Sequence, residues 1–127
     1  MNRKLKYFIL TAILFLSGFL YSCRDNMKFE QAGWMQKDDI GGYPNRDNML
    51  LDLTENYKLK GLSCRQLKYL LGYPENYLDC DSNTFCYNIV TKYRHDIDPT
   101  YIKTLNVSFN VDSIVTDFKV YEYKQNI

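Results

Sequence analysis

The sequence predicts an α+β domain with two N-terminal helices packed on a three-stranded antiparallel sheet (ααβββ). Apolar residues recur at helical spacing in two segments of residues 46–72, and they alternate with polar residues in three segments of residues 85–123. The aromatic content of 16%, with twelve Tyr and seven Phe, favours β-structure. Helices followed by strands, without alternation, indicate an α+β fold and not an α/β fold.

The first helix is predicted to begin at Arg46. Asn45 is a suitable N-cap, and the carboxylate of Asp47 suits the positive end of the helix dipole. The apolar face of this helix consists of Met49, Leu50, Leu53 and Tyr57. The intervals between these residues place them on one side of a helix, so that side is expected to lie in the core.

The second helix is predicted to begin after Ser63. Ser63 and Gln66 stand three residues apart, as in a capping box, where each side chain binds the backbone N–H of the other residue. The expected apolar face is Leu67, Leu70 and Leu71. Gly72 suits the backbone conformation that ends a helix, and Pro74 prevents its continuation.

The strands are predicted at residues 85–93, 102–111 and 114–123. The expected core residues of the second helix and the strands are Leu67, Leu70, Leu105, Val107, Phe109 and Phe118. Because the helices cover one face of the sheet, the other face is expected to be exposed to solvent. That exposed face is predicted to carry Asn106, Ser108, Lys119, Tyr121 and Tyr123.

The N-terminal segment has the layout of a signal peptide. Residues 1–6 are basic and residues 7–20 are mostly apolar, a run too short for a spanning helix of about 20 residues. It ends in Leu20-Tyr21-Ser22-Cys23, which resembles the lipobox of bacterial lipoproteins. We therefore predict a lipoprotein signal peptide at residues 1–22. The alternatives are a secretory signal cut at another position and an uncleaved anchor.

The lipobox resemblance implies a lipid anchor on Cys23. Cys23 would become the first residue, with a diacylglyceryl thioether on its sulfur and an acyl chain such as palmitate on its amino group. Two or three acyl chains hold a protein stably at a membrane, whereas a single chain does not. The expected location is the bacterial cell envelope, at the outer membrane and facing the periplasm.

Residues 23–44 are predicted to form a polar tether that includes the lipidated Cys23. Residues 45–127 are predicted to form the folded domain. The tether segment has no sustained period, and Gly41-Gly42 and Pro44 break regular structure. Trp34 has two interpretations. It packs back onto the domain, since an exposed Trp gains nothing in water, or it contacts a partner protein.

Three cysteines follow the lipobox. An extracytoplasmic compartment permits disulfides, and Cys80 and Cys86, which flank five residues, form the favoured pair. A bridge that uses Cys64, or no bridge, is the alternative. The three cysteines lack CxxC spacing and His95 is the only histidine, so no metal site is predicted.

Charge and motifs exclude two classes of function. Without residues 1–22 the chain has 13 Lys and Arg and 15 Asp and Glu, a net charge of −2. A mildly acidic domain lacks the basic surface that nucleic-acid binding requires. No nucleophile, acid–base or phosphate-binding motif is recognisable in the sequence, so we predict no catalytic residue, no cofactor and no enzymatic activity.

One stretch resembles a known family. It consists of Leu59-Lys60-Gly61-Leu62-Ser63, then Gln66-Leu67, then Leu70-Leu71-Gly72-Tyr73-Pro74, and it resembles the pattern of the SmpA/OmlA (BamE-like) lipoproteins. The resemblance implies a small ααβββ unit anchored in the outer membrane. The best-known members of that family are accessory subunits of the machine that inserts β-barrel proteins, and beta-lactamase inhibitor proteins have a similar layout of two helices and three strands.

The chain is therefore expected to be a lipid-anchored, non-catalytic module that binds an envelope protein. Its expected role is in outer-membrane protein assembly or in envelope integrity. The predicted binding residues are Tyr121, Tyr123 and Trp34, because interfaces favour mixed polar and aromatic surfaces. Two alternatives remain open. The chain could inhibit or regulate a periplasmic enzyme, or it could be a ligand-binding or hydrolytic lipoprotein at the cell surface.

Overall fold

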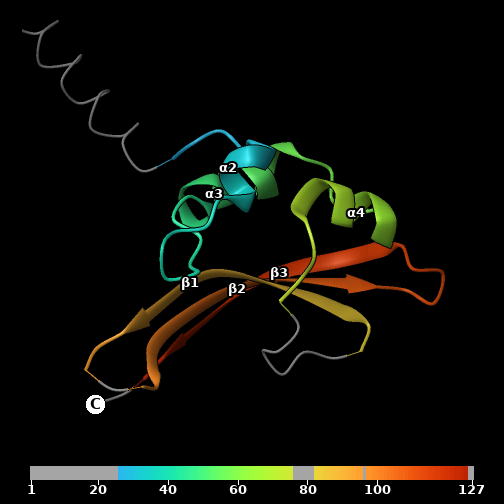
Figure 1. Ribbon diagram of the computed structural model, residues 1–127. Helices are drawn as coiled ribbons and strands as arrows, with labels where there is room; N and C mark the ends of the chain where they lie inside the picture. The colour runs from blue at the N-terminus through green and yellow to red at the C-terminus, as the bar shows by residue number, and fades with distance from the viewer. Residues whose placement is uncertain (1–25, 76–81, 96, 126–127) are drawn as a thin grey trace, which may run out of the picture.

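The computed structural model describes residues 26–75, 82–95 and 97–125 (Figure 1). The elements are α2 (Gln31–Met35), α3 (Arg46–Asn56), α4 (Cys64–Leu71), β1 (Thr84–Tyr93), β2 (Pro99–Phe109) and β3 (Val115–Lys124). The helices lie together on one side of the sheet. The predicted α+β class is confirmed, and α3 and α4 correspond to the two predicted helices. Helix α2 was not predicted, and the predicted signal peptide lies outside the described residues.

Helix α4 begins and ends where the sequence predicted. Ser63 Oγ accepts a hydrogen bond from the Gln66 backbone N–H at 3.2 Å, and Gln66 Oε1 accepts one from the Ser63 N–H at 2.9 Å. This is the predicted capping box. At the other end Gly72 has a φ of 83°, a conformation that glycine adopts without steric cost.

The sheet is antiparallel with strand order β1-β2-β3, so β2 is the central strand. Leu105 of β2 pairs with Tyr87 of β1 and Val120 of β3, and these three side chains point toward the helices. The register of β1 shifts between Asn88 and Val90. This bulge at Ile89 was not predicted, because strict alternation places Asn88 and Val90 on the same face.

The core lies between the helix layer and the inner face of the sheet. Of the predicted core residues, Leu67, Leu105 and Val107 are fully buried, which confirms them. Leu70, Phe109 and Phe118 are only partly buried and pack against the core. The remaining buried apolar residues are Phe29, Trp34, Met49, Leu50, Leu53, Leu59, Leu71, Cys86, Tyr87, Ile89 and Val115.

The folded unit begins earlier than predicted. Phe29 is 8% exposed and Trp34 is fully buried, and both belong to the core cluster. Their rings lie 5.7 Å apart, and Trp34 Nε1 donates a hydrogen bond to the Leu71 carbonyl at 3.1 Å. Part of the segment predicted as a tether therefore packs against the domain predicted from residue 45, because two large aromatic side chains hold in place a segment whose sequence has no helical or strand period. The first interpretation of Trp34, packing on the domain, is confirmed.

Asp52 of α3 holds the segment that precedes α2. Its Oδ2 accepts a hydrogen bond from the Phe29 backbone N–H at 2.7 Å, and its Oδ1 accepts one from Asn56 Nδ2 at 2.6 Å. The bond from Phe29 is the main reason that the pKa of Asp52 is lowered. The charged carboxylate therefore stabilises the folded chain at neutral pH.

This lowered pKa predicts a pH dependence. The contribution of Asp52 is present above the pKa of an unfolded Asp, about 3.9, and is lost as the pH falls through the lower folded pKa. We expect Asp52→Asn to unfold at lower urea than the wild type near neutral pH, with the difference shrinking in strong acid. Glu55→Gln, an exposed change on the same helix, is the control. A difference that does not depend on pH would contradict a role for the carboxylate charge.

Candidate functional site

The candidate site is the outer face of the sheet, on the side without helices. In the register of β2 and β3, Asn106 pairs with Lys119 and Thr104 pairs with Tyr121. Tyr123 pairs with Ile102 and points the same way, because alternate residues of a strand share a face. The structure thus brings the predicted residues Asn106, Ser108, Lys119, Tyr121 and Tyr123 to one face.

Only part of this outer face is open. Tyr121 and Tyr123 on β3 are 52% and 56% exposed. On β1 and β2, by contrast, Cys86 is fully buried and Thr104 is 9% exposed. Asn106 Oδ1 is also buried, with no hydrogen-bond partner among the residues described. The accessible part of the face is therefore the edge strand β3 with its two tyrosines.

The two exposed tyrosines present a surface suited to contact with a protein. A tyrosine offers a large apolar ring and a hydroxyl, and it loses little conformational entropy when it is buried. Interfaces are enriched in tyrosine for these reasons. Lys119 on the same face adds a positive charge next to the rings.

Trp34 does not belong to this surface. Its side chain is fully buried between α2, α4 and Arg46, so in this conformation it has no surface with which to contact a partner. This burial disagrees with the second interpretation of Trp34, in which its side chain binds a partner protein. The indole ring is held inside by the Phe29 ring, 5.7 Å away, and by the Leu71 carbonyl, which accepts a hydrogen bond from its N–H.

The structure describes two of the three cysteines that follow the lipobox, Cys64 and Cys86. Cys86 is disulfide-bonded and Cys64 is a free thiol, so a bridge that uses Cys64 is excluded. Cys80, the predicted partner of Cys86, lies outside the described residues, and the pairing stays a prediction. Cys23, the predicted lipidation site, also lies outside them.

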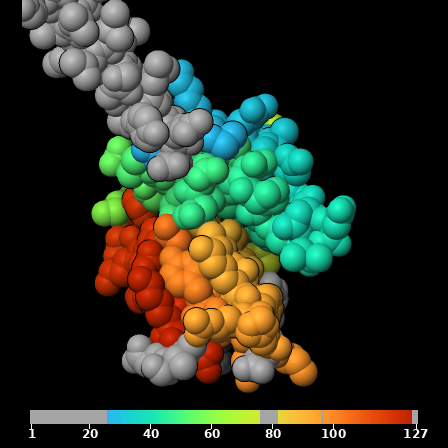
Figure 2. Space-filling model, turned by 90° about the vertical axis from the view of Figure 1, so that its left-hand side faces the viewer, coloured from blue at the N-terminus to red at the C-terminus, as the bar shows by residue number. Residues whose placement is uncertain are grey.

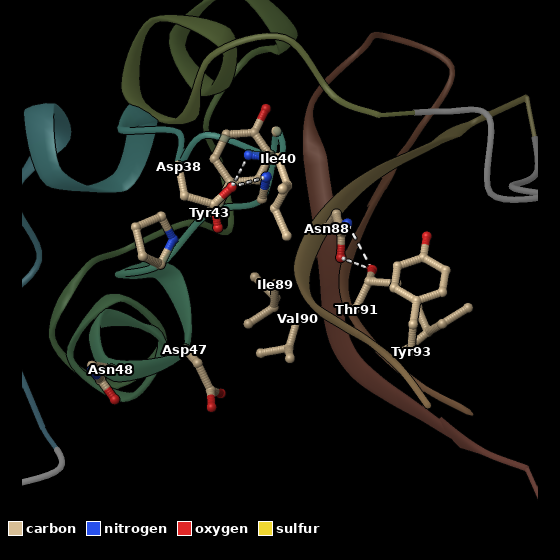
Figure 3. A pocket seen from close by; sticks show the side chains of 14 residues that line it. Asp38, Ile40, Tyr43, Asp47, Asn48, Asn88, Ile89, Val90, Thr91 and Tyr93 are labelled. Atoms are coloured by element: carbon tan, nitrogen blue, oxygen red, sulfur yellow. Dashed lines mark hydrogen bonds between the residues drawn. The ribbon is translucent and has the colours of Figure 1, made fainter. Parts of the chain in front are cut away.

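A cleft opens beside β1, between its bulge and the loop of residues 38–44 (Figure 3). Its volume is about 510 Å³, and its walls include Ile40, Tyr43, Val90 and Tyr93. Asp38 Oδ1 accepts hydrogen bonds from the backbone N–H groups of Ile40 and Gly42 at 3.0 and 2.7 Å, so this carboxylate holds the loop in its turn.

The second carboxylate of this cleft is also paired. Asp47 Oδ1 lies 2.8 Å from Lys103 Nζ, and this hydrogen bond is the main cause of the raised pKa of Lys103. Glu122 Oε1 lies 3.9 Å from the same ammonium group. These charges hold β2 and β3 against α3.

Sequence reasoning missed a buried polar cluster around Arg46. Arg46 is 2% exposed, and its Nη1 lies 3.3 Å from Glu75 Oε2 and 2.8 Å from the Asn88 carbonyl oxygen. Glu75 Oε2 in turn accepts a hydrogen bond from the Asn88 backbone N–H at 2.9 Å. The pair thus satisfies the backbone of β1 at its bulge.

Aromatic rings complete this cluster. The guanidinium carbon of Arg46 lies 3.3 Å from the ring centre of Tyr43 and 4.9 Å from that of Trp34. Burial lowers the pKa of Arg46, while Glu75 opposes that shift. Burial also raises the pKa of Tyr87 far above its usual range, and its hydroxyl donates to the Gly72 carbonyl at 3.0 Å. These groups bind one another, so the cluster is structural.

The described residues contain no group of three His, Cys, Asp or Glu side chains that could hold a metal ion. Among the same residues, no helix is both long enough and apolar enough to cross a membrane. Comparison of the chain with known protein families, curated proteins and solved structures finds no match.

Proposed function

We propose that this chain is a lipid-anchored lipoprotein of the bacterial cell envelope that binds another protein and performs no catalysis. The signal peptide would span residues 1–22, Cys23 would carry the lipid, and the domain would face the periplasm from the outer membrane. The binding surface is the open part of the sheet around Tyr121 and Tyr123.

The observation that carries the binding role is the exposure of two neighbouring tyrosines on a sheet face that no described helix covers. Large aromatic side chains that stand together on an open face are typical of protein interfaces, which are enriched in tyrosine. The paired carboxylates of the cleft support a non-catalytic role, since each already holds a backbone group or a lysine.

The resemblance to the SmpA/OmlA lipoproteins supports outer-membrane assembly as the process. The capping box at Ser63 and the helix end at Gly72 fall within the stretch that carries the resemblance. The order of α3, α4, β1, β2 and β3 agrees with the ααβββ unit that the resemblance implies.

The lipid anchor is tested at Cys23. We expect mass spectrometry of the protein purified from membranes to find an acylated Cys23 at the amino terminus. Cys23→Ser should leave the precursor uncleaved, because the signal peptidase for lipoproteins acts on the lipidated cysteine. Cys64→Ser is the control and should be processed like the wild type. An unmodified terminus at any other residue would show that the lipobox assignment is wrong.

The binding surface is tested by capture from detergent-solubilised membranes. We expect the chain to recover a barrel-insertion complex. The double variant Tyr121→Ala with Tyr123→Ala should reduce this recovery roughly tenfold or more, because aromatic anchors contribute much of the binding energy of an interface. Tyr69→Ala, which removes a 79% exposed ring on α4, is the matched control and should leave recovery unchanged.

Other outcomes of the same capture separate the alternatives. Recovery of a single soluble enzyme through Tyr121 would favour an inhibitor or regulator, and would contradict the role in assembly. Recovery that survives the double tyrosine substitution would show that the binding surface lies elsewhere on the domain. Thermal unfolding of each variant, measured in parallel, distinguishes lost contacts from a lost fold.

A further inference from the structure

The folded part of the chain begins close to the proposed lipid anchor. The Met27 backbone N–H donates a hydrogen bond to the Asn48 carbonyl at 2.7 Å, and the Phe29 side chain is buried. The chain is therefore fixed to α3 from Met27 onward. Four residue steps separate Met27 from Cys23, and a fully extended chain covers roughly 14 Å in that distance. A tether of this length cannot let the domain rotate freely at a membrane surface.

Half-exposed apolar side chains surround the point where this segment meets the helices. Met27, Met35, Leu51 and Tyr57, here called the exit collar, are 42%, 39%, 44% and 40% exposed. Each adjoins the segment of residues 26–29. Met27 and Met35 line one hollow, Leu51 lines a groove with Asn26, and the Tyr57 ring lies 5.0 Å from the Phe29 ring.

The segment of residues 26–29 and the outer face of the sheet, which carries Tyr121 and Tyr123, lie on opposite sides of the domain. Figure 1 shows the first described residues, in blue, beside the helix layer and away from the sheet. Figure 2 shows this arrangement from another side. The blue segment lies at the top, the helix residues in green lie beneath it, and the strands in orange and red lie at the bottom. One helix layer and the sheet therefore separate Met27 and Met35 from Tyr121 and Tyr123, whereas Leu51 lies at the rim of the collar, in a groove that also contains Val120 and Glu122 of β3.

We propose that the exit collar rests on the lipid bilayer, so that the helix layer faces the membrane and Tyr121 and Tyr123 face away from it. The inference rests on the proposed lipidation of Cys23, because only a lipid at that position places the bilayer within reach of the collar. Methionine, leucine and tyrosine side chains are suited to the boundary between headgroups and acyl chains.

The lipid anchor explains why so small an apolar surface suffices. Four half-exposed side chains bury too little area to bind a free protein to a membrane. A short tether raises the effective concentration of the bilayer at the collar, so a weak contact becomes populated. The unlipidated Cys23→Ser protein is accordingly expected not to bind vesicles by itself.

The orientation is tested on the lipidated protein in phosphatidylethanolamine and phosphatidylglycerol vesicles that contain a lipid with a nitroxide on its headgroup. A fluorophore is attached at Met27→Cys or, as the matched control, at Tyr123→Cys, in a Cys64→Ser background. We expect quenching at position 27 to exceed that at position 123 at least about twofold, since one helix layer and the sheet, together about 20 Å thick, separate the two positions.

A second variant isolates the tether. A flexible Gly/Ser linker of about 20 residues, inserted between Asp25 and Asn26, should abolish the difference in quenching, because the domain can then rotate. Equal quenching at the two positions with the native tether, or stronger quenching at position 123, would overturn the orientation. A terminus without lipid, read by mass spectrometry, would overturn the proposed anchor as well, so the two failures are distinguishable.

Discussion

Replacement of Arg46 by methionine is expected to lower the free energy of unfolding by about 3–5 kcal/mol, the range found when one partner of a buried ion pair is removed. The change leaves the Glu75 carboxylate without its cation and the Asn88 carbonyl without its donor. Glu75→Gln should also destabilise the domain, because the buried guanidinium then has no counter-charge. Urea unfolding of the purified domain measures both effects.

The Arg46 and Glu75 substitutions should not be additive. In the double variant Arg46→Met with Glu75→Gln neither charge is left unpaired, so its loss is expected to be smaller than the sum of the two single losses. Lys60→Met is the control, because it breaks an exposed pair at 3.8 Å with Asp117 and should cost no more than about 1 kcal/mol. Equal losses for Arg46→Met and Lys60→Met would show that the buried pair has no special role.

The sequence could not show this pair. Arg46 was expected only as the first residue of a helix, a position usually exposed to solvent. Its partners Glu75 and Asn88 lie 29 and 42 residues away, and such distant contacts leave no periodic pattern in a single sequence. The bulge at Ile89, whose neighbouring backbone groups the pair binds, is hidden for the same reason.

Local signals, in contrast, predicted most of the elements. The capping box at Ser63 and the glycine at position 72 fixed both ends of α4, because each requires only residues next to it in the chain. Strand alternation placed Tyr121 and Tyr123 on one face, which the register confirms. It could not show that Cys86 and Thr104 on the same face are buried, since burial depends on distant segments.

Trp34→Ala is expected to lower the free energy of unfolding by about 3–5 kcal/mol, as for large aromatic side chains in a packed core. The substitution removes a fully buried ring that contacts Phe29 and lies 4.9 Å from the Arg46 guanidinium. It also leaves the Leu71 carbonyl without its donor. Total stability of 5–15 kcal/mol is typical of small domains, so this single change is expected to remove between about a fifth and all of it.

A matched series separates the roles of Trp34. Trp34→Phe keeps an aromatic ring but loses the indole N–H, and is expected to fall between the wild type and Trp34→Ala. Tyr69→Ala, on a 79% exposed ring, should change stability by no more than about 0.5 kcal/mol. A chain that starts at Asn45 lacks both Phe29 and Trp34 and is expected not to fold. If that shortened chain unfolded cooperatively at the temperature of the wild type, residues 26–44 would be a tether after all, and the burial of Trp34 would contribute nothing to stability.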